Sequence, residues 1–165
     1  MKILSPAKIN LFLRICGKRP DGYHELFSLM CRVTLFDEIL LQTGAGKTIE
    51  IDCSHPDVPA DDTNLAYRAA SLFQRKLNSA RGINIHLKKN IPAAAGLGGG
   101  SSNAASVLMA LNTYYERPFS REQLMELGLT LGADVPFCIF QKPAIARGIG
   151  EKLEAFEAAL PYHIL

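Results

Sequence analysis

Residues 96–102 read GLGGGSS, and the interpretation of the whole chain begins from this stretch. Four glycines and two serines in seven positions are typical either of a flexible linker or of a pocket built from main chain. A linker separates ordered units, but here alternation predicts a strand just before the stretch and helical spacing predicts a helix just after it. The order of strand, glycine turn and helix therefore favours a pocket.

The predicted helix after the glycines supplies the chemistry of an anion site. Amides at a helix N-terminus and the helix dipole attract phosphate, and glycine lets a phosphate approach without meeting a Cβ atom. Ser101, Ser102 and Asn103 can cap the helix or offer oxygen atoms to a phosphate or its Mg²⁺. We therefore predict phosphate binding here, with a tight structural turn as the alternative.

Two common phosphate motifs do not fit this loop. A P-loop requires Lys immediately before the Ser, and Gly100 occupies that place. A dinucleotide fingerprint counted from Gly96 puts Ser101 where its last glycine belongs. The stretch GAGKT at 44–48 imitates the end of a P-loop, but a strand follows it instead of a helix. We interpret Lys47 as part of a hairpin.

Strand patterns dominate the first half of the chain. Alternation of apolar and polar residues predicts a half-buried strand over 9–16, and Pro and Gly mark a turn after it. Residues 28–42 and 47–53 are predicted as extended segments joined by a hairpin at TGAG. Alternation returns at 82–89, where Ile83, Ile85 and Leu87 share one face.

Helical spacing of apolar residues predicts helices at 61–78, 102–115 and 120–132. The last of these opens with a capping box, Ser120 with Gln123, and is expected to stop at Gly132. After it, ADVPFCIFQ is predicted as a loop followed by a strand. PAIARGIGEKLEAF is predicted as a hairpin across its two glycines.

The order of these elements predicts the fold class. Strands come first and then alternate with helices, which indicates an α+β domain with helices packed on one face of a mixed sheet. A length of 165 residues corresponds to one domain. The apolar end PYHIL predicts the start of a buried strand, because domains usually end on polar residues. We therefore expect the chain to be part of a longer protein.

Composition limits the class of partner. The chain has 18 basic and 16 acidic residues, a balance that disfavours duplex nucleic acid or a membrane surface as partner. Its four cysteines are widely spaced, without a C-x-x-C motif, and its four histidines show no metal-type spacing with them. Pro6, Lys8 and Asn10 interrupt the apolar core that a signal peptide requires. We therefore expect a cytoplasmic protein with reduced thiols.

Three stretches together resemble the GHMP kinases, which include galactokinase, homoserine kinase and mevalonate kinase. PAAAGLGGGSSNAA at 92–105 resembles their ATP-binding motif. SPAKINLFL with RPDGYHELFSLM resembles the N-terminus of one branch, and LGLTLGADVPFCI resembles its catalytic loop. That branch transfers the γ-phosphate of ATP to the 2-hydroxyl of a methylerythritol linked to cytidine diphosphate, in the non-mevalonate route to isoprenoid precursors.

The resemblance covers essentially the whole chain and implies a domain arrangement. Residues 1–165 match the N-terminal ATP-binding domain of the family, whose fold is ribosomal protein S5 domain 2-like. The family has a C-terminal domain with a further glycine-rich motif and part of the substrate cleft, and we expect that domain to be missing from this chain. The resemblance thus implies a kinase fragment that is inactive or very weak by itself.

The resemblance also assigns site residues. Lys8 and Asp134 match the catalytic pair, while Asn10, Tyr23 and His24 match substrate positions, the last two near the cytosine. ATP is implied as co-substrate and Mg²⁺ as cofactor, with Ser102 as the candidate ligand of the ion. The positions that match the ATP site are Lys89, Pro92, Ala93, Ala94, Ala95, Gly96, Leu97, Gly98, Gly99, Gly100, Ser101 and Ser102.

From the residues alone, each candidate also has a structural interpretation. Lys8 fits an exposed strand lysine, and Tyr23 fits a core tyrosine at a strand start. Asp134 fits a turn aspartate on a stiff segment, because Pro136 is expected to hold Val135 in an extended conformation.

Three functions stay open at this point. The first is a kinase for the cytidine diphosphate compound or for another small alcohol, and the second is a nucleotide-binding fragment without catalysis. The third is an RNA-binding module, because a ribosomal protein shares the fold. The net charge of +2 and the absence of interleaved basic and aromatic residues disfavour the third.

Overall fold

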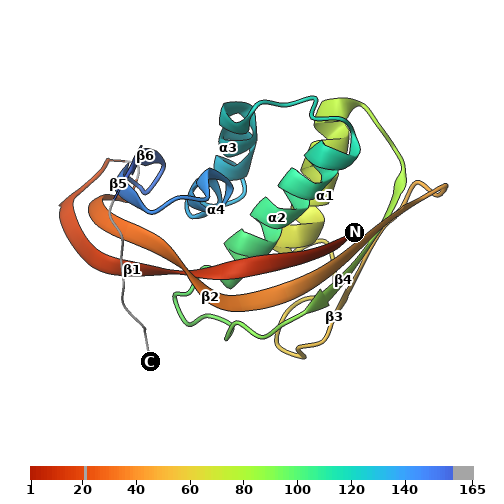
Figure 1. The fold of residues 1–165 in the computed structure, drawn as a ribbon, viewed down its shortest axis with the longest axis horizontal. Helices are drawn as coiled ribbons and strands as arrows, with labels where there is room; N and C mark the ends of the chain where they lie inside the picture. The colour runs from red at the N-terminus through yellow and green to blue at the C-terminus, as the bar shows by residue number, and fades with distance from the viewer. Residues whose placement is uncertain (21, 158–165) are drawn as a thin grey trace.

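Helices gathered on one face of a mixed sheet form the domain (Figure 1). Within residues 1–20 and 22–157, which a computed structural model describes, six strands and four helices occur. The predicted α+β class is therefore confirmed. The stretch PYHIL, predicted as the start of a strand, lies outside the described residues.

Strand β2 (His24–Gly44) is the centre of the sheet. Strand β1 (Lys2–Lys18) runs antiparallel along one edge of β2. The other edge of β2 is divided between two antiparallel partners, β5 (Ala144–Gly148) near its start and β4 (Gly82–Lys88) near its end. β2 therefore joins the two halves of the sheet.

The predicted hairpin at TGAG is wrong. Strand β3 (Ile49–Cys53) pairs in parallel with β4, so β4 lies between β2 and β3. The alternate residues of β4 are buried on one face, which suits a strand with neighbours on both edges. Local turn chemistry marks the bend but does not decide which strands pair. Lys47 is exposed in this bend.

The other predicted hairpin is confirmed. β5 and β6 (Lys152–Ala155) pair antiparallel, and Gly148 and Gly150 between them take positive φ values of 72° and 114°. Glycine is the residue that adopts this conformation without a steric cost.

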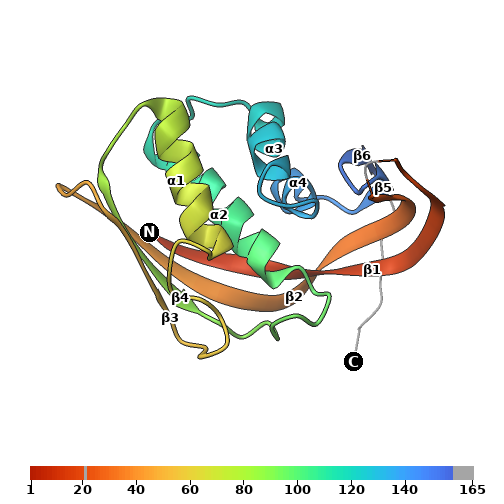
Figure 2. The ribbon, with the colours of Figure 1, turned by 180° about the vertical axis from the view of Figure 1, so that it is seen from behind.

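The two long helices run side by side across the sheet (Figure 2). Helix α1 (Leu65–Leu77) is capped by the Asn64 side chain, which accepts a hydrogen bond from the Ala66 amide. Helix α2 (Gly99–Tyr114) begins three residues earlier than the predicted helix, so part of the glycine stretch forms its first turn. Within the described ranges, no helix is long and apolar enough to cross a bilayer.

Two shorter helices follow. The capping box of Ser120 and Gln123 at the start of α3 (Arg121–Leu129) is confirmed, but the helix ends three residues before the predicted Gly132. ADVPFCIFQ was predicted as a loop and a strand, and this prediction is wrong because it contains helix α4 (Val135–Phe140). A short buried apolar run does not distinguish the two by periodicity.

Helix α4 also corrects the prediction for Val135. Pro136 occupies the first turn of the helix, where a missing amide hydrogen costs nothing, so Val135 is helical and not extended. Asp134 is the N-cap residue of this helix. The aspartate is thus placed by the packing of α4, whose residues 135–139 are all buried.

The core fills the space between the helices and the sheet. Its largest fully buried side chains come from the strands β2 and β4, the segment after β4 and the helices α1, α2 and α4. They are Phe73, Phe137, Ile39, Leu41, Ile83, Ile85, Ile91, Leu108, Leu111, Ile139, Val107 and Val135.

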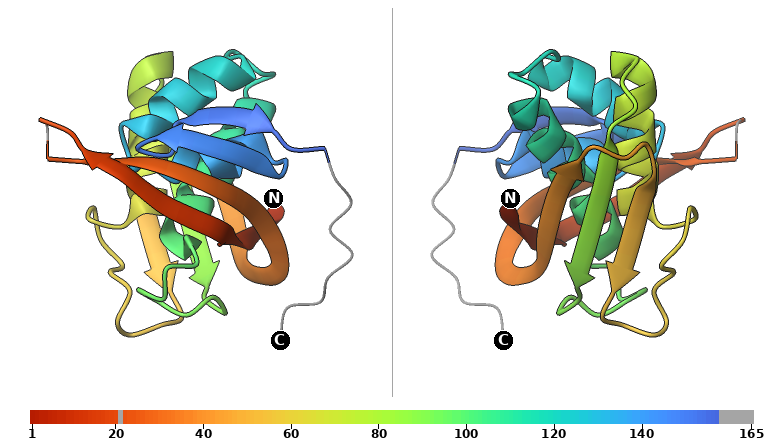
Figure 3. Two further views of the ribbon diagram at one scale, coloured as in Figure 1. Left: turned by 90° about the vertical axis from the view of Figure 1, so that its left-hand side faces the viewer. Right: turned by 90° about the vertical axis from the view of Figure 1, so that its right-hand side faces the viewer.

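The far end of the β1–β2 pair lies beyond the helices (Figure 3). The predicted strand over 9–16 is confirmed, but its half-buried character is wrong from residue 11 onward, where both faces are exposed. Leu13 is 54% exposed and Ile15 is 60% exposed. The apolar contacts there are local, with Phe12 edge-on to Phe27 and Arg147 over the Phe27 ring.

Gly128 tests the contact between α3 and α4 that positions Asp134. A Cβ atom at this residue would lie 2.7 Å from Val135 Cγ1 and 3.0 Å from Ile139 Cδ1. Helix propensity alone favours alanine by about 1 kcal/mol, whereas overpacking costs about 1–3 kcal/mol. We expect Gly128→Ala to lower the free energy of unfolding in a denaturant titration. The double variant Gly128→Ala, Val135→Ala should lose less than the sum of the single losses, and additive losses would contradict the clash.

Candidate active site

A pocket of about 590 Å³ lies at the N-terminus of α2. Its walls include both predicted catalytic residues and every predicted ATP-loop residue except Ser102. The segment before α1 forms a further wall of the pocket. This wall was not predicted from the sequence, because the Pro and Asp residues of the segment are typical of an ordinary loop. The residues of this wall are Asp57, Val58, Pro59, Thr63, Asn64 and Leu65.

The first turn of α2 exposes amides to the pocket. Gly98 is the N-cap with φ 66°, no side chain caps the helix, and its first turn contains no acidic residue. The Ser102 amide donates to the Gly98 carbonyl at 2.8 Å, which closes the first turn. The amides of residues 99–101 precede this bond, and the first amides of a helix have no intrahelical acceptor. This end of α2 is therefore suited to bind an anion.

The loop before the helix follows a path that glycine favours. Ala94, Gly96 and Gly98 take positive φ values of 55°, 74° and 66°. Ala94 thus adopts a left-handed conformation although it carries a Cβ atom, at a cost of roughly 1–2 kcal/mol. Alanine at this position restricts the loop more than glycine would.

Lys8 and Asp134 meet at the edge of the pocket. The Lys8 ammonium lies 3.3 Å from Asp134 Oδ2. The side chain of Lys8 is 8% exposed and that of Asp134 is 35% exposed. An exposed strand lysine is thereby excluded, and the pair presents one cation and one partly accessible carboxylate on the same side of the pocket.

Irregular strand geometry connects Lys8 to the loop. The pairing of β1 with β2 shifts register between Pro6 and Lys8 and again between Asn10 and Phe12. Such bulges redirect side chains at functional sites. The Lys8 amide donates to the Leu97 carbonyl at 2.9 Å, so β1 holds the middle of the glycine loop directly.

Asn10 orients the Lys8 ammonium. Its Oδ1 accepts a hydrogen bond from Lys8 Nζ at 2.8 Å, and its Nδ2 donates to Ser28 Oγ at 2.7 Å. The Ser28 hydroxyl donates in turn to the Phe12 carbonyl at 2.7 Å. Both ends of the Asn10 amide are therefore engaged within the protein, and Asn10 does not line the pocket.

The structure does not bring Tyr23 and His24 to this pocket. Both are exposed at the far end of the β1–β2 pair, and neither contributes to the pocket wall. The Tyr23 residue is 56% exposed, so the alternative of a core tyrosine is excluded.

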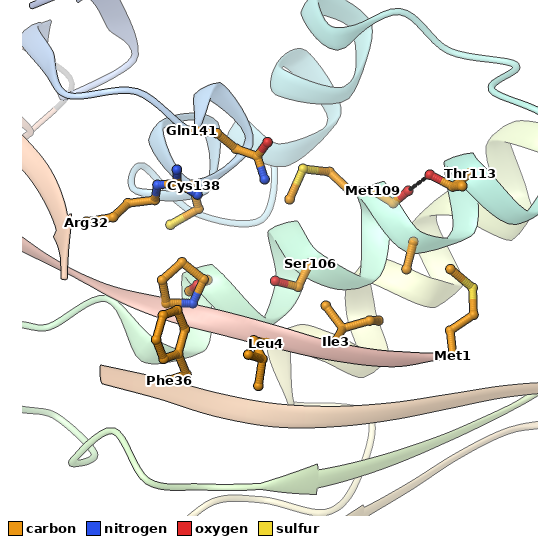
Figure 4. Close-up of a pocket in the computed structure, with 13 residues that line it drawn as sticks. Met1, Ile3, Leu4, Arg32, Phe36, Ser106, Met109, Thr113, Cys138 and Gln141 are labelled. Atoms are coloured by element: carbon orange, nitrogen blue, oxygen red, sulfur yellow. Dashed lines mark hydrogen bonds between the residues drawn. The ribbon is translucent and has the colours of Figure 1, made fainter. Parts of the chain in front are cut away.

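The Ser102 hydroxyl also lies away from the phosphate loop. It is 1% exposed and accepts a hydrogen bond from Ser5 Oγ at 2.8 Å. Ser102 lines a second pocket of about 430 Å³, between β1 and helices α2 and α4 (Figure 4). Ser101, the neighbouring hydroxyl, lines the loop pocket instead.

Lys89 lies beneath the loop. Its ammonium forms an ion pair with Asp37 and donates to Asn103 Oδ1 at 3.2 Å. Only 4% of the Lys89 side chain is exposed. Asp37 was not predicted from the sequence, where its one signal is an aspartate that, with Glu38, interrupts the apolar residues of LFDEIL.

The chain is similar to known proteins over most of its length. Residues 64–142 match the family of GHMP kinases at its N-terminal domain. The chain is 48% identical over 157 residues to the 4-diphosphocytidyl-2-C-methyl-D-erythritol kinase of Citrifermentans bemidjiense, covering 95% of this chain and 56% of that protein. It is 49% identical over 155 residues to the kinase of the same name from Syntrophus aciditrophicus, covering 94% of this chain and 55% of that protein.

A solved structure agrees with these relatives. The crystal structure of a 4-(cytidine 5'-diphospho)-2C-methyl-D-erythritol kinase superposes with a TM-score of 0.82 at 42% identity, over 94% of this chain and 55% of that chain. The chain spans about half the length of the curated relatives it matches. The likeness therefore concerns one half of those proteins.

Cys138 is predicted to be an unreactive thiol. Burial, and after it the nearby Asp134 carboxylate, raise the pKa of this thiol to about 12. The thiol is therefore protonated at pH 8, and the reactive thiolate is scarce. Iodoacetamide at pH 8, followed by mass spectrometry, should label the exposed Cys16 long before Cys138. Labelling of both at the same rate would contradict the burial of Cys138.

Gly98 and Gly96 form a matched pair for testing the contact between the loop and Lys8. Both take positive φ, so alanine at either residue costs roughly 1–2 kcal/mol of backbone strain. A Cβ atom at Gly98 would lie 2.8 Å from Lys8 Cγ, whereas one at Gly96 would meet nothing within 4 Å. We expect Gly98→Ala to be the more destabilising variant in a denaturant titration, by about 1–3 kcal/mol.

The cause of that difference can be checked with Lys8→Ala. Removing the Lys8 side chain should make Gly98→Ala and Gly96→Ala equally destabilising. A difference that persists in the Lys8→Ala background would show that the loop and Lys8 are not in contact.

Proposed function

The chain carries the N-terminal domain of a GHMP kinase, and from this premise we propose that it is the ATP-holding half of a small-molecule kinase. The observation that carries the proposal is the Lys8–Asp134 pair, 3.3 Å apart at the edge of the glycine-loop pocket. The proposed substrate is 4-diphosphocytidyl-2-C-methyl-D-erythritol, supported by the names of relatives that are 48% and 49% identical. The reaction belongs to the non-mevalonate isoprenoid pathway.

In the proposed reaction the first turn of α2 binds the phosphates of ATP. The oxygen of the 2-hydroxyl attacks the γ-phosphorus, and the bond from that phosphorus to the β–γ bridging oxygen breaks, releasing ADP. The proton of the hydroxyl passes to the Asp134 carboxylate. A largely dissociative transition state delays that transfer, so the carboxylate needs only to orient the alcohol and accept the proton late.

Lys8 neutralises charge in this scheme. Its ammonium is held by Asn10 Oδ1 and Asp134 Oδ2, which fixes it beside the reacting oxygen. A pre-oriented cation needs no reorganisation as negative charge develops on the transferring group. Asn10 therefore serves first to position Lys8, a role that is compatible with a further contact to substrate.

Magnesium in this proposal arrives with the nucleotide. Within the described residues, no group of three or more His, Cys, Asp or Glu side chains could hold a metal ion alone. Ser101 is an oxygen-bearing residue of the pocket that would complete the coordination of an ion carried by the phosphates. The ion supplies charge neutralisation of the phosphates.

The cytosine end of the substrate is proposed to lie at the far end of the β1–β2 pair. Tyr23 and His24 are exposed there, and an exposed aromatic ring can stack on a base. Because the chain spans about half of its relatives, we propose that the isolated chain binds ATP and transfers phosphate weakly or not at all. A cytoplasmic location is proposed as well, since all four cysteines are free.

The proposal is tested on the chain alone and on the chain joined to the second half of the Citrifermentans bemidjiense relative. ATP binding is measured by calorimetry and product formation by phosphorus NMR with the cytidine diphosphate compound. Both proteins should bind ATP, and the joined protein should form the 2-phosphate. Failure of both to bind ATP would reject the proposal, whereas binding without product in the joined protein would favour a non-catalytic nucleotide-binding domain.

Asp134→Asn in the joined protein tests the mechanism. Loss of the proton acceptor should lower turnover by about 10²–10⁴-fold, while the dissociation constant for ATP stays within about twofold. Asp52→Asn is the control, since the Asp52 side chain is 79% exposed and lies outside the pocket wall. Normal turnover of Asp134→Asn would remove this residue from the mechanism.

A further inference from the structure

Asp37 in β2 is a fully buried carboxylate that accepts hydrogen bonds from four donor groups. It is 0% exposed, and its Oδ1 accepts from the Asn90 and Ile91 amides, both at 2.8 Å. Its Oδ2 accepts from the Lys89 ammonium and from Asn103 Nδ2, the latter at 3.0 Å. All the donors come from two short segments, 89–91 and residue 103.

Those two segments bracket the glycine loop. Residues 89–91 immediately precede it, and Asn103 follows it in α2. Lys89 and Asn103 also contact each other at 3.2 Å, and Asn103 Nδ2 lies 3.1 Å from Ser5 Oγ in β1. One carboxylate therefore ties together the point where the loop leaves the sheet and the point where it becomes helix.

Asp37 does not touch the pocket. It is absent from the pocket wall, and the Lys89 side chain is only 4% exposed. The ammonium instead lies under the first turn of α2, where a Cβ atom at Gly99 would be 3.0 Å from Lys89 Nζ. Lys89 and Asn103 line the pocket, so Asp37 acts on a ligand through these two residues and through the position of the loop.

Stability alone does not account for such a pair. A buried ion pair pays a large desolvation cost and often contributes no more to stability than apolar residues of the same volume. A glycine-rich loop, by contrast, has much conformational entropy to lose, and fixing it beforehand improves binding.

We propose that Asp37 is a positioning residue that fixes both ends of the glycine loop, so that its amides are in place before a phosphate binds. The identity of the ligand rests on the function proposed above, whereas the anchoring of the loop is a property of the fold. Asp37 acts through Lys89, Asn103 and the amides of residues 90 and 91.

Three variants and one control test the anchor in the 165-residue chain. Asp37→Asn removes the charge, Lys89→Met removes its partner, and the double variant removes both charges, which favours folding because no charge stays buried alone. The control is Glu38→Gln. Glu38 is the next residue of β2 and forms exposed ion pairs with Lys2 and Lys88, which lower its pKa to about 2, but it does not contact the loop.

The first measurement is amide hydrogen exchange without any ligand. In Asp37→Asn and in the double variant, exchange of the hydrogen-bonded amides of residues 8, 90, 91 and 102 should become at least about tenfold faster, while β4 keeps its protection. Glu38→Gln should leave all of these amides as in the parent chain. If Asp37→Asn does not fold, the double variant decides. Exchange in the loop equal to that of Glu38→Gln would overturn the anchor.

The second measurement compares dissociation constants for ATP and AMP at a temperature where every variant is folded. Loss of the anchor should weaken ATP binding by about tenfold more than AMP binding, because in the proposed mode the loop amides bind the β- and γ-phosphates that AMP lacks. A merely structural role would weaken both equally, and that result would overturn the positioning role. A parent chain without any preference for ATP over AMP would instead overturn the proposed function and the phosphate part of this inference, while the exchange experiment still decides whether Asp37 anchors the loop.

Discussion

The domain has to hold in place a loop that contains almost no side chains. Glycine at 96 and from 98 to 100 lets main-chain amides approach a ligand, but it removes the side-chain contacts that normally fix a loop. The contacts that fix the loop therefore come from residues outside the loop. The Lys8 amide holds the Leu97 carbonyl at 2.9 Å, and the Asp37 carboxylate holds the segments on either side of the loop. The long strands β1 and β2 supply both residues, Lys8 and Asp37.

The two ion pairs near the loop differ in a way that fits different tasks. Asp37 is 0% exposed and has all of its acceptor positions occupied, so it cannot exchange a proton with a ligand without breaking the anchor. The side chain of Asp134 is 35% exposed and has one ion-pair contact, with Lys8. A carboxylate with free acceptor capacity at the edge of a pocket is the one suited to meet a hydroxyl. Burial and hydrogen-bond saturation thus distinguish Asp37 from Asp134, the proposed proton acceptor, although both face a lysine.

Sequence patterns succeeded where one residue type dictates local geometry. The glycine stretch, the capping box at Ser120 and the alternation of β4 each predicted their element, because backbone conformation and periodicity are local properties. They failed where the outcome depends on packing. The buried run VPFCIF carries no periodicity and became α4, and the bend at TGAG could not reveal that β4 would lie between β2 and β3. The partners of Asp37 are 52 to 66 residues away in the chain, so no local pattern points to them.

The same dependence on packing explains why the candidate site is complete at one end only. Lys8, Asp134 and the glycine loop are placed by β1, α4 and α2, which all pack on the described core, so the phosphate end of the site is formed within this chain. Tyr23 and His24 lie at the far end of the β1–β2 pair, beyond the helices, where apolar residues such as Leu13 and Ile15 are more than half exposed. The proposed phosphate site and the proposed base site are therefore physically separate in this fold, because the first relies on anchored backbone and the second on a strand pair whose faces are exposed.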